Sequence, residues 1–242
     1  MPNLELPPPD VLIESGAVLI VNKPGGLLTQ APPGIDSLEL RTKRWLIVRD
    51  NKPGKAYLAV PHRLDRPVSG IMVLAKNVRA ARRISEQFQE RTVTKIYWAV
   101  VEGVPDAAQG QWIDFMRKIP DEAKSEIVPA DHPDAKKAIL NFRVLHSADE
   151  KSLIQIELET GRTHQIRLQC ASRGHCILGD ELYGSTAKFG PITRDIRKRW
   201  IALHSRKIGL THPMEKTPLE ATAPFSDHWD VFEEFREWIH GR

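Results

Sequence analysis

The sequence predicts an α+β fold built on a mixed, mostly antiparallel central β-sheet flanked by helices. Three observations indicate this class: strand-like segments outnumber helix-like ones, many neighbouring strands look like hairpins, and helix-like segments carry an apolar stripe. The chain of 242 residues is 41% hydrophobic and shows no internal repeat. It is therefore long enough for one large domain or two small ones.

The first half of the chain alternates expected strands and helices. Residues 1–11 include a proline-rich run and are expected to be an unpacked lead-in to a single domain over residues 12–242. Ser37 and Asn77 can cap two helices, because their short side chains accept hydrogen bonds from a first helical turn. The expected strands are residues 18–21, 57–60, 71–75 and 95–101, and the expected helices are residues 38–48 and 78–90.

The second half is predicted to be mainly β-structure. Segments 138–145 and 153–158 are expected to form an antiparallel pair, since the second alternates apolar and polar residues. Residues 119–135, rich in Pro, Asp and Lys, are predicted to be a long loop. Further strands are expected at residues 110–115, 201–210 and 219–222, and helices at residues 163–173 and 227–239. The last helix is expected to pack through Val231, Phe235, Trp238 and Ile239.

Composition argues against several classes of protein. The longest apolar run is far shorter than the ~20 residues of a membrane span, and the first ten residues lack the pattern of a signal peptide. Cys170 and Cys176 are too few for a disulfide scaffold, and with His164 and His175 they match no zinc-finger or zinc-ribbon spacing. We therefore expect a cytoplasmic protein with no metal site and no membrane association.

The formal net charge is +4, and the basic residues gather in five clusters. Each cluster alone is typical of an ordinary exposed surface. Together they favour a surface that follows a phosphate backbone. The clusters lie within residues 41–44, 79–83, 136–137, 194–199 and 206–207.

One segment, PHRLDRPVSGIMVLAKN at residues 61–77, concentrates charged groups around a turn. Its carboxylate, Asp65, stands between Arg63 and Arg66 and precedes an apolar strand. Taken alone, such an aspartate is as consistent with a solvated loop as with a site. Residues 95–97 and 161–167 also place cationic or reactive side chains at a strand end or a tight turn, and Lys23 follows a strand where it can face a ligand.

These segments resemble a known family. HRLDRPVSGIMVLAK resembles the catalytic motif of the RluA-type RNA pseudouridine synthases, and GRTHQIR resembles their second signature. KIYWAVVEG is similar to the strand between them, and VNKPGGLLTQ, GHCILGDELYG and LHSRKIGLTHP resemble further blocks in the family's order. The resemblance covers roughly residues 12–225. It implies the pseudouridine synthase fold and an isomerase that acts on specific uridines of structured ribosomal or transfer RNA, without a cofactor.

The resemblance also implies roles for individual residues. Asp65 matches the catalytic aspartate, Tyr97 the tyrosine that stacks on the target base, and Arg162 the basic residue that pairs with the carboxylate. The other residues expected to bind substrate are Arg63, His62, Lys95, His164, Gln165 and Arg167. Val68 and Gln169 depart from the family's common Thr and His, and neither departure is expected to remove activity.

The chemistry of the reaction agrees with these residue types. Conversion of uridine to pseudouridine breaks the N1–C1′ bond and forms a C5–C1′ bond, so no redox cofactor or energy source is required. A single carboxylate can perform the covalent or proton-transfer step. Whether Asp65 attacks the sugar, attacks the base or removes a 2′ proton stays open. An aromatic ring such as that of Tyr97 can hold the detached base by stacking, worth about 1–3 kcal/mol.

Two other functions stay open at this point. One is a non-catalytic RNA-binding protein that retains the fold, and the other is a nucleosidase that uses Asp65 to release free uracil. The family often carries a separate N-terminal RNA-binding domain, which is not expected here. We therefore expect a monomeric, stand-alone catalytic domain, in which the segment 119–135 is a candidate for RNA specificity.

Overall fold

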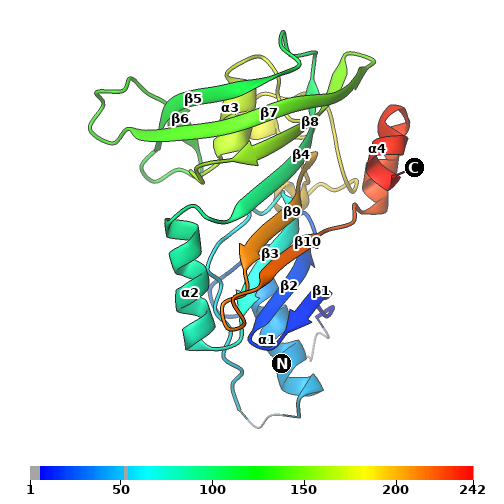
Figure 1. Cartoon of the computed structure of the whole chain (residues 1–242). Coiled ribbons are helices and arrows are strands. Elements are labelled where there is room, and N and C mark those ends of the chain that lie inside the picture. Colours follow the sequence, from blue (N-terminus) through cyan, green and yellow to red (C-terminus); the bar gives the residue numbers. More distant parts are fainter. Residues whose placement is uncertain (1–5, 52–53, 242) are drawn as a thin grey trace.

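The computed structural model describes residues 6–51 and 54–241 and has one β-sheet at its centre (Figure 1). The strands are β1 (Asp10–Ser15), β2 (Val18–Lys23), β3 (Ser69–Ala75), β4 (Thr94–Glu102), β5 (Gln109–Lys118), β6 (Ser125–Ile127), β7 (Lys136–Ala148), β8 (Lys151–Leu158), β9 (Leu203–Thr211) and β10 (Pro218–Thr222). The helices are α1 (Leu38–Arg49), α2 (Val78–Gln89), α3 (Gln165–Ala171) and α4 (Arg236–His240). In this described part of the chain, no helix is long and apolar enough to cross a membrane.

The sheet has the order β1-β2-β3-β9-β4-β8-β7-β5-β6, and β10 pairs with β9. Strands β3 and β9 are parallel, and the other described neighbours are antiparallel. The late strand β9 thus lies between β3 and β4, and it joins the two halves of the sheet (Figure 1). This mixed, mostly antiparallel sheet with helices packed on it confirms the predicted α+β class.

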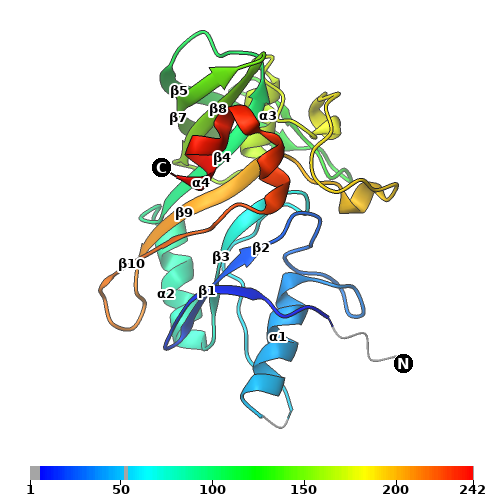
Figure 2. The ribbon, with the colours of Figure 1, turned by 90° about the vertical axis from the view of Figure 1, so that its right-hand side faces the viewer.

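Strands β2 and β3 are buried on both faces, because a helix covers each face. Successive residues of β2 belong to different clusters: Leu19 lies in the cluster with Leu46 of α1, and Ile20 lies in the cluster with Ile84 of α2. Figure 2 shows α1 and α2 on opposite sides of these strands. This arrangement explains why the sequences of β2 and β3 are continuous apolar runs.

The predicted helix caps and most of the predicted strands are confirmed. Ser37 accepts a hydrogen bond from Leu40 N at the start of α1, and Asn77 accepts one from Ala80 N at the start of α2. Strand β1 begins at Asp10, inside the predicted lead-in, of which residues 1–5 lie outside the described part. The predicted loop 119–135 contains the short strand β6, which pairs with β5.

The predicted strand 57–60 is wrong, since it is reduced to one bridge between Ala59 and Ala75. Beyond this bridge, the imidazole of His62 replaces a backbone partner, because its Nε2 accepts the hydrogen bond from Val73 N at 2.8 Å. The helix predicted at residues 163–173 is also shorter, because His164 has a φ of 55° and α3 begins only after it. A residue in the left-handed conformation cannot be part of a right-handed helix, so Thr163 and His164 lie outside α3.

The helix predicted at residues 227–239 is wrong over most of its length. Two 3₁₀ turns, Asp227–Val231 and Glu233–Phe235, precede α4. The buried side chains Trp229, Phe232 and Phe235 recur every three residues, which is the period of a 3₁₀ helix. Val231 and Trp238, which were expected in the packing stripe, are 68% and 40% exposed.

Gly70 lies where β3 approaches β9 most closely. Its φ is +111°, and a Cβ built on it would lie 2.3 Å from Ser205 O and 2.6 Å from Ser205 N. Backbone atoms cannot move away from such a contact as a flexible side chain can. Only glycine therefore fits at this position of the parallel β3–β9 pair.

We expect Gly70→Ala to lower the free energy of unfolding by about 4 kcal/mol, because it combines the steric clash with an unfavourable φ. Thermal unfolding of the purified variant measures this loss, at about 2–4 °C for each kcal/mol in a chain of this size. Gly16→Ala is the matched control, because Gly16 has a φ of +49° but no atom within 4 Å of the added Cβ. The control should lose only about 1 kcal/mol, and equal losses would contradict the steric explanation.

Candidate active site

A pocket with a volume of about 140 Å³ lies between the Asp65 loop, β4 and the start of α3. An engineered cavity of about 150 Å³ holds one benzene ring, so the pocket has the size of a single six-membered ring. The predicted catalytic residues Asp65, Tyr97 and Arg162 all line it. The other lining residues are Arg63, Leu64, Val68, Leu158, Gly161, Thr163, His164, Gln165, Ile166, Arg167 and Leu203.

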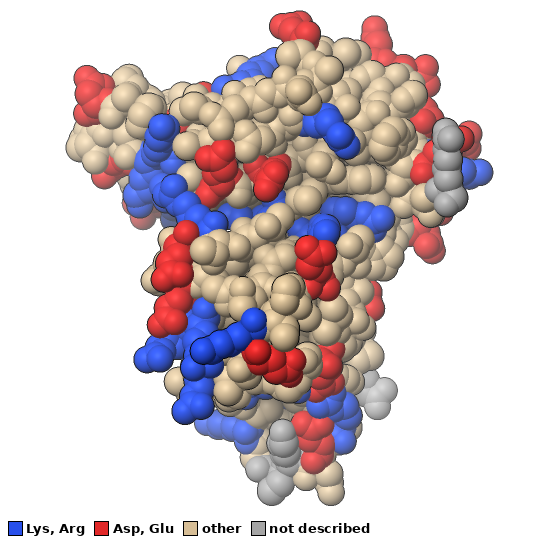
Figure 3. Space-filling model, viewed as in Figure 1, with Lys and Arg blue, Asp and Glu red and all other residues tan. Residues whose placement is uncertain are grey.

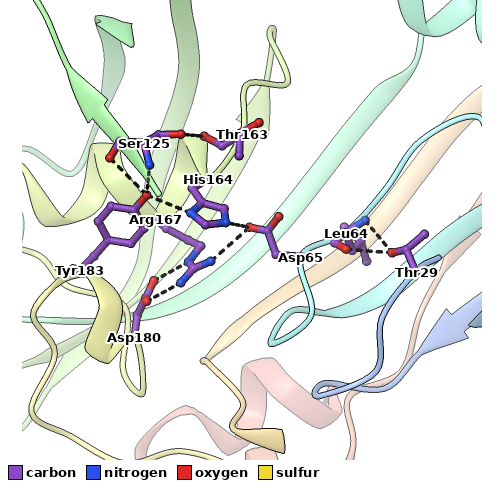
Figure 4. A network of polar contacts seen from close by, with 9 residues as sticks. All are labelled: Thr29, Leu64, Asp65, Ser125, Thr163, His164, Arg167, Asp180 and Tyr183. Atoms are coloured by element: carbon purple, nitrogen blue, oxygen red, sulfur yellow. Dashed lines mark hydrogen bonds and ion pairs between the residues drawn. The ribbon is translucent and has the colours of Figure 1, made fainter. Parts of the chain in front are cut away.

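The loop that carries Asp65 is fixed from behind by the segment that follows β2. Thr29 Oγ1 donates a hydrogen bond to Leu64 O at 2.8 Å and accepts one from Leu64 N at 3.2 Å (Figure 4). A turn follows directly, in which Val68 N donates to Asp65 O at 3.1 Å. The residue before Asp65 and its own carbonyl are thus both held, which restricts the position of the carboxylate.

Lys23 provides a second attachment for the same loop. Its ammonium donates to the carbonyl oxygens of Pro24 at 2.9 Å, Leu27 at 2.8 Å and Arg66 at 3.3 Å. Burial lowers the pKa of Lys23 to about 7. Lys23, which was expected where it can face a ligand, does not line the pocket of Asp65. Its side chain is fully buried and connects the segment after β2 to the loop after Asp65.

Arg167 on α3 makes the ionic contact with Asp65 (Figure 4). Its Nη1 lies 3.4 Å from Asp65 Oδ2, while its Nε and Nη2 each lie 2.7 Å from a carboxylate oxygen of Asp180. Arg167 and Asp180 are both almost completely buried. Although burial alone lowers the pKa of Arg167, the hydrogen bond and charge of Asp180, with the charge of Asp65, raise it overall. The bidentate pair therefore holds a permanent cation against Asp65.

Arg162 does not form the predicted ion pair with Asp65. Although it lines the same pocket, its Nε donates to Lys137 O at 3.0 Å. Within residues 6–51 and 54–241, the ion-pair partner of Asp65 is Arg167, and the ring of His164 also contacts the carboxylate. Arg167, which lies on α3, thus makes the contact that was expected of Arg162, which lies in the loop before α3.

His164 connects Asp65 to a chain of hydrogen bonds. Its Nε2 lies 3.5 Å from Asp65 Oδ2, its Nδ1 lies 2.9 Å from Tyr183 Oη, and Ser125 N donates to that same hydroxyl at 2.9 Å (Figure 4). Burial lowers the pKa of His164, although the charge of Asp65 opposes this. The ring is therefore neutral at pH 7. With its proton on Nε2, it donates toward Asp65 Oδ2, and its Nδ1 accepts from Tyr183 Oη.

Both His164 and Arg167 contact the same oxygen of Asp65, Oδ2. In the described part of the chain, Oδ1 has no hydrogen-bond partner, and the Asp65 side chain is 20% exposed. One carboxylate oxygen is thus fixed by the protein, and the other can reach a bound molecule. This division suits a carboxylate that must attack an atom or accept a proton.

Tyr97 closes another side of the pocket from β4. It is 9% exposed, and burial raises its pKa to about 12, although a hydrogen bond with Ser205 of β9 opposes the shift. The phenol is therefore neutral at physiological pH. A neutral, fixed aromatic ring is suited to stacking on a planar ring in the pocket.

The other residues predicted to bind substrate divide into two groups. Arg63, like Asp65, lines both this pocket and a second pocket that includes the segment Leu28–Gln30. Gln165 lines the pocket but serves mainly to hold the loop before α3, because its Oε1 accepts from Thr160 Oγ1 at 2.8 Å and from Arg162 N at 3.0 Å.

His62 and Lys95 lie outside the pocket, contrary to their prediction as substrate-binding residues. The ring of His62 stacks on Phe88 of α2 at 4.6 Å and accepts from Val73 N. Lys95 is half-buried, and burial with the nearby charge of Arg91 lowers its pKa. Both side chains face the α2 side of the sheet, so we assign His62 a structural role.

His62, which is partly buried, and His204, which is buried, should make the fold sensitive to acid. Burial lowers the pKa of His62 and of His204 to about 3, whereas an unfolded histidine has a pKa near 6.5. The stabilisation is therefore complete above pH 6.5 and is lost as the pH falls toward 3, since the unfolded chain then binds protons that the folded chain does not. Between about pH 7 and pH 5, we expect a loss near 2 kcal/mol for each histidine.

Urea unfolding at both pH values measures this loss. His62→Gln keeps an acceptor for Val73 N but cannot take up a proton in this range, so it should show a pH-dependent loss smaller by about 2 kcal/mol. An unchanged pH dependence in this variant would show that His62 is not one of the groups responsible.

The sequence interpretation missed three residues of the site: Thr29, Asp180 and Tyr183. Asp180 and Tyr183 lie in GHCILGDELYG, and Thr29 lies in VNKPGGLLTQ, both of which resemble family blocks. A buried aspartate in such a block is a signal for a partner, because carboxylates are rarely buried unless they are paired. The sequence could not show that this partner is Arg167.

Comparison with known proteins gives consistent matches. A family model described as RNA pseudouridylate synthase matches residues 17–172. An uncharacterized RNA pseudouridine synthase of Synechocystis is 32% identical over 231 residues, covering 92% of this chain and 67% of that protein. Another, of Zymomonas mobilis, is 34% identical and covers 88% of this chain and 92% of that protein.

The ribosomal large subunit pseudouridine synthase C of Vibrio cholerae is 32% identical over 90% of this chain and 66% of its own length. This chain thus spans about two thirds of the Synechocystis and Vibrio proteins. Among solved structures, human RNA pseudouridylate synthase domain containing 4 has a TM-score of 0.74 at 22% identity, covering 91% of this chain and 90% of that one. At this level of identity, the similarity shows a shared fold.

Proposed function

Because the chain belongs to the RNA pseudouridine synthase family, whose members are isomerases, we propose that it converts a uridine of structured RNA into pseudouridine in the cytoplasm. Asp65 is the proposed nucleophile or base, and Tyr97 the proposed stacking residue. The observation that carries this assignment is a ring-sized pocket in which a carboxylate with one unengaged oxygen shares the lining with a buried phenol.

Each residue then has a distinct task. Asp65 Oδ1 provides the electron pair, while Arg167 and His164 hold Oδ2 and fix the direction of the carboxylate. Tyr97 holds the uracil ring after the N1–C1′ bond breaks, so that the ring can turn and form the C5–C1′ bond. The proton on C5 leaves to solvent, and a proton is gained at N1, so atoms and electrons balance. Flipping the target from its stack costs a few kcal/mol, which contacts with the RNA backbone can offset.

The proposed substrate class is ribosomal RNA of the large subunit. The support comes from relatives, since the Vibrio cholerae and Vibrio vulnificus proteins carry this substrate in their names. Transfer RNA is the alternative substrate that the family resemblance leaves open.

Release of tritium from RNA that carries tritium at C5 of uridine tests the proposal. The full chain should release tritium from a transcript of large-subunit ribosomal RNA, and no free uracil should appear. Free uracil would instead indicate a nucleosidase. If neither this transcript nor unmodified transfer RNA releases tritium, the proposal is contradicted. The remaining alternative is then a non-catalytic RNA-binding protein.

A further inference from the structure

The basic clusters of the sequence differ in whether their charges are neutralised. Four of the five have at least two members engaged with acidic side chains or carbonyl oxygens. Their contacts are Arg41–Asp36, Lys43–Glu39, Arg82–Glu86, Arg83–Pro213 O, Arg197–Asp195, Arg199–Glu181, Arg206–Ala223 O and Lys207–Glu220. Such clusters are typical of an ordinary protein surface.

The fifth cluster, Lys136–Lys137 at the start of β7, is different. Within the described part of the chain, neither ammonium has a hydrogen-bond or ion-pair partner, and both side chains are exposed. Lys136 pairs with Met116 of β5 across the sheet, and Lys118 lies two residues further along β5. Because strand side chains alternate, Lys118 and Lys136 share a face and Lys137 points to the other. Lys118 is also exposed and unpaired within residues 6–51 and 54–241.

Lys118 and Lys136 line a groove of about 400 Å³ that begins at the catalytic pocket. The segment Gly161–Thr163 lines both the groove and the pocket. Arg162 therefore stands at the junction, with its Nε fixed by Lys137 O. Asp134 is the acidic residue that lines the groove, and Arg117 is neutralised by Glu126 at 2.6 Å.

Figure 3 shows Lys and Arg side chains below the β5–β6 hairpin and along the waist of the molecule, where the two halves of the sheet meet. Unpaired cations in an open groove attract a polyanion, and their contacts with its phosphates release the counterions condensed on it. A strand whose target base occupies the catalytic pocket must pass its neighbouring phosphates over the rim of that pocket. The groove provides such a path on the Arg162 side.

We propose that the groove between the β5–β6 hairpin and the segment Gly161–Thr163 binds the RNA backbone next to the target nucleotide, with Lys118 and Lys136 as the phosphate ligands. The proposal rests on the proposed function, since it takes RNA as the occupant. In this proposal, the end of β5 and the start of β7 position the RNA strand, and they flank the segment 119–135. Contacts of this kind fix the register of the strand without reading its bases.

The test compares three double variants with the wild type in binding a fluorescent single-stranded oligouridylate between about 50 and 200 mM salt. Lys118→Ala/Lys136→Ala should raise Kd about tenfold and reduce the slope of log K against log salt by about 1.4, since each lost phosphate contact on single strands removes about 0.7. Lys118→Arg/Lys136→Arg keeps both charges and should bind like the wild type. Arg44→Ala/Arg79→Ala removes two exposed charges from α1 and α2, and it should also bind like the wild type.

An unchanged Kd and slope in Lys118→Ala/Lys136→Ala would overturn the proposal. An equal loss in the Arg44→Ala/Arg79→Ala variant would also overturn it, because net charge would then explain the effect. Tritium release by the wild type from a large-subunit ribosomal RNA transcript is measured separately. Failure of that assay contradicts the proposed function, whereas failure of the binding comparison with an active wild type contradicts the groove alone.

Discussion

Asp65→Asn should reduce tritium release from RNA by at least about 10⁴-fold, because the amide can neither attack carbon nor accept a proton at neutral pH. The change is nearly isosteric, and the buried pair of Arg167 and Asp180 stays intact without Asp65. The fold should therefore survive. The measurement is a single-turnover assay with excess enzyme, which separates chemistry from product release.

The binding of RNA by the same variant provides the control. Asp65→Asn removes a negative charge from a basic surface, so its Kd for the RNA transcript should equal or fall below that of the wild type. A variant that binds RNA but converts it at the wild-type rate would remove Asp65 from the mechanism. A variant that loses both folding and binding would instead indicate a structural role for the carboxylate.

Replacement of Arg167 should have the largest combined effect on stability and activity. In Arg167→Met, Asp180 is left buried and unpaired, which should lower the free energy of unfolding by about 3–5 kcal/mol. Asp65 also loses the cation at its Oδ2. Because a misplacement of about 1 Å can cost about 100-fold in rate, activity should fall by at least that factor. Urea unfolding and tritium release measure the two effects.

A second substitution separates the two roles of Arg167. Arg167→Met/Asp180→Leu removes both buried charges, so stability should return to within about 2 kcal/mol of the wild type. Activity should not return, because the cation that contacts Asp65 Oδ2 is still missing. Recovery of activity together with stability would show that Arg167 acts only through the fold. Arg162→Met should cost much less stability than Arg167→Met, because the Arg162 guanidinium contact is an exposed hydrogen bond to Lys137 O.

The parts of the fold that the sequence predicts are those with local causes. The caps at Ser37 and Asn77 depend on one side chain and the next turn, and both are present. The alternating residues of β8 likewise depend on one buried face. The segment at residues 57–60 fails because its backbone partner is replaced by the His62 side chain, which is a tertiary contact. The C-terminal helix fails because the period of Trp229, Phe232 and Phe235 is three rather than 3.6.

The candidate site shows the same limit. Residue types and family resemblance bring Asp65, Tyr97 and Arg162 to one pocket. They do not distinguish Arg162 from Arg167, because these two arginines lie five residues apart and the difference depends on His164 in its left-handed conformation. The sequence correctly places Lys23 at the end of a strand. It does not predict the full burial of Lys23, which depends on the segment Pro24–Leu27 folding back over the side chain.

The place of β9 in the sheet has a consequence for synthesis on the ribosome. The N-terminal strands emerge first, but β3 and β4 cannot become neighbours through β9 until residues 203–211 have been made. Until then each presents an unpaired edge, and Gly70 and Tyr97 lack their contacts with Ser205. The site around Asp65 and Tyr97 should therefore stay incomplete until residues 203–211 have emerged. Such dependence on late, distant pairing also predicts slow folding and a need for protection of those edges.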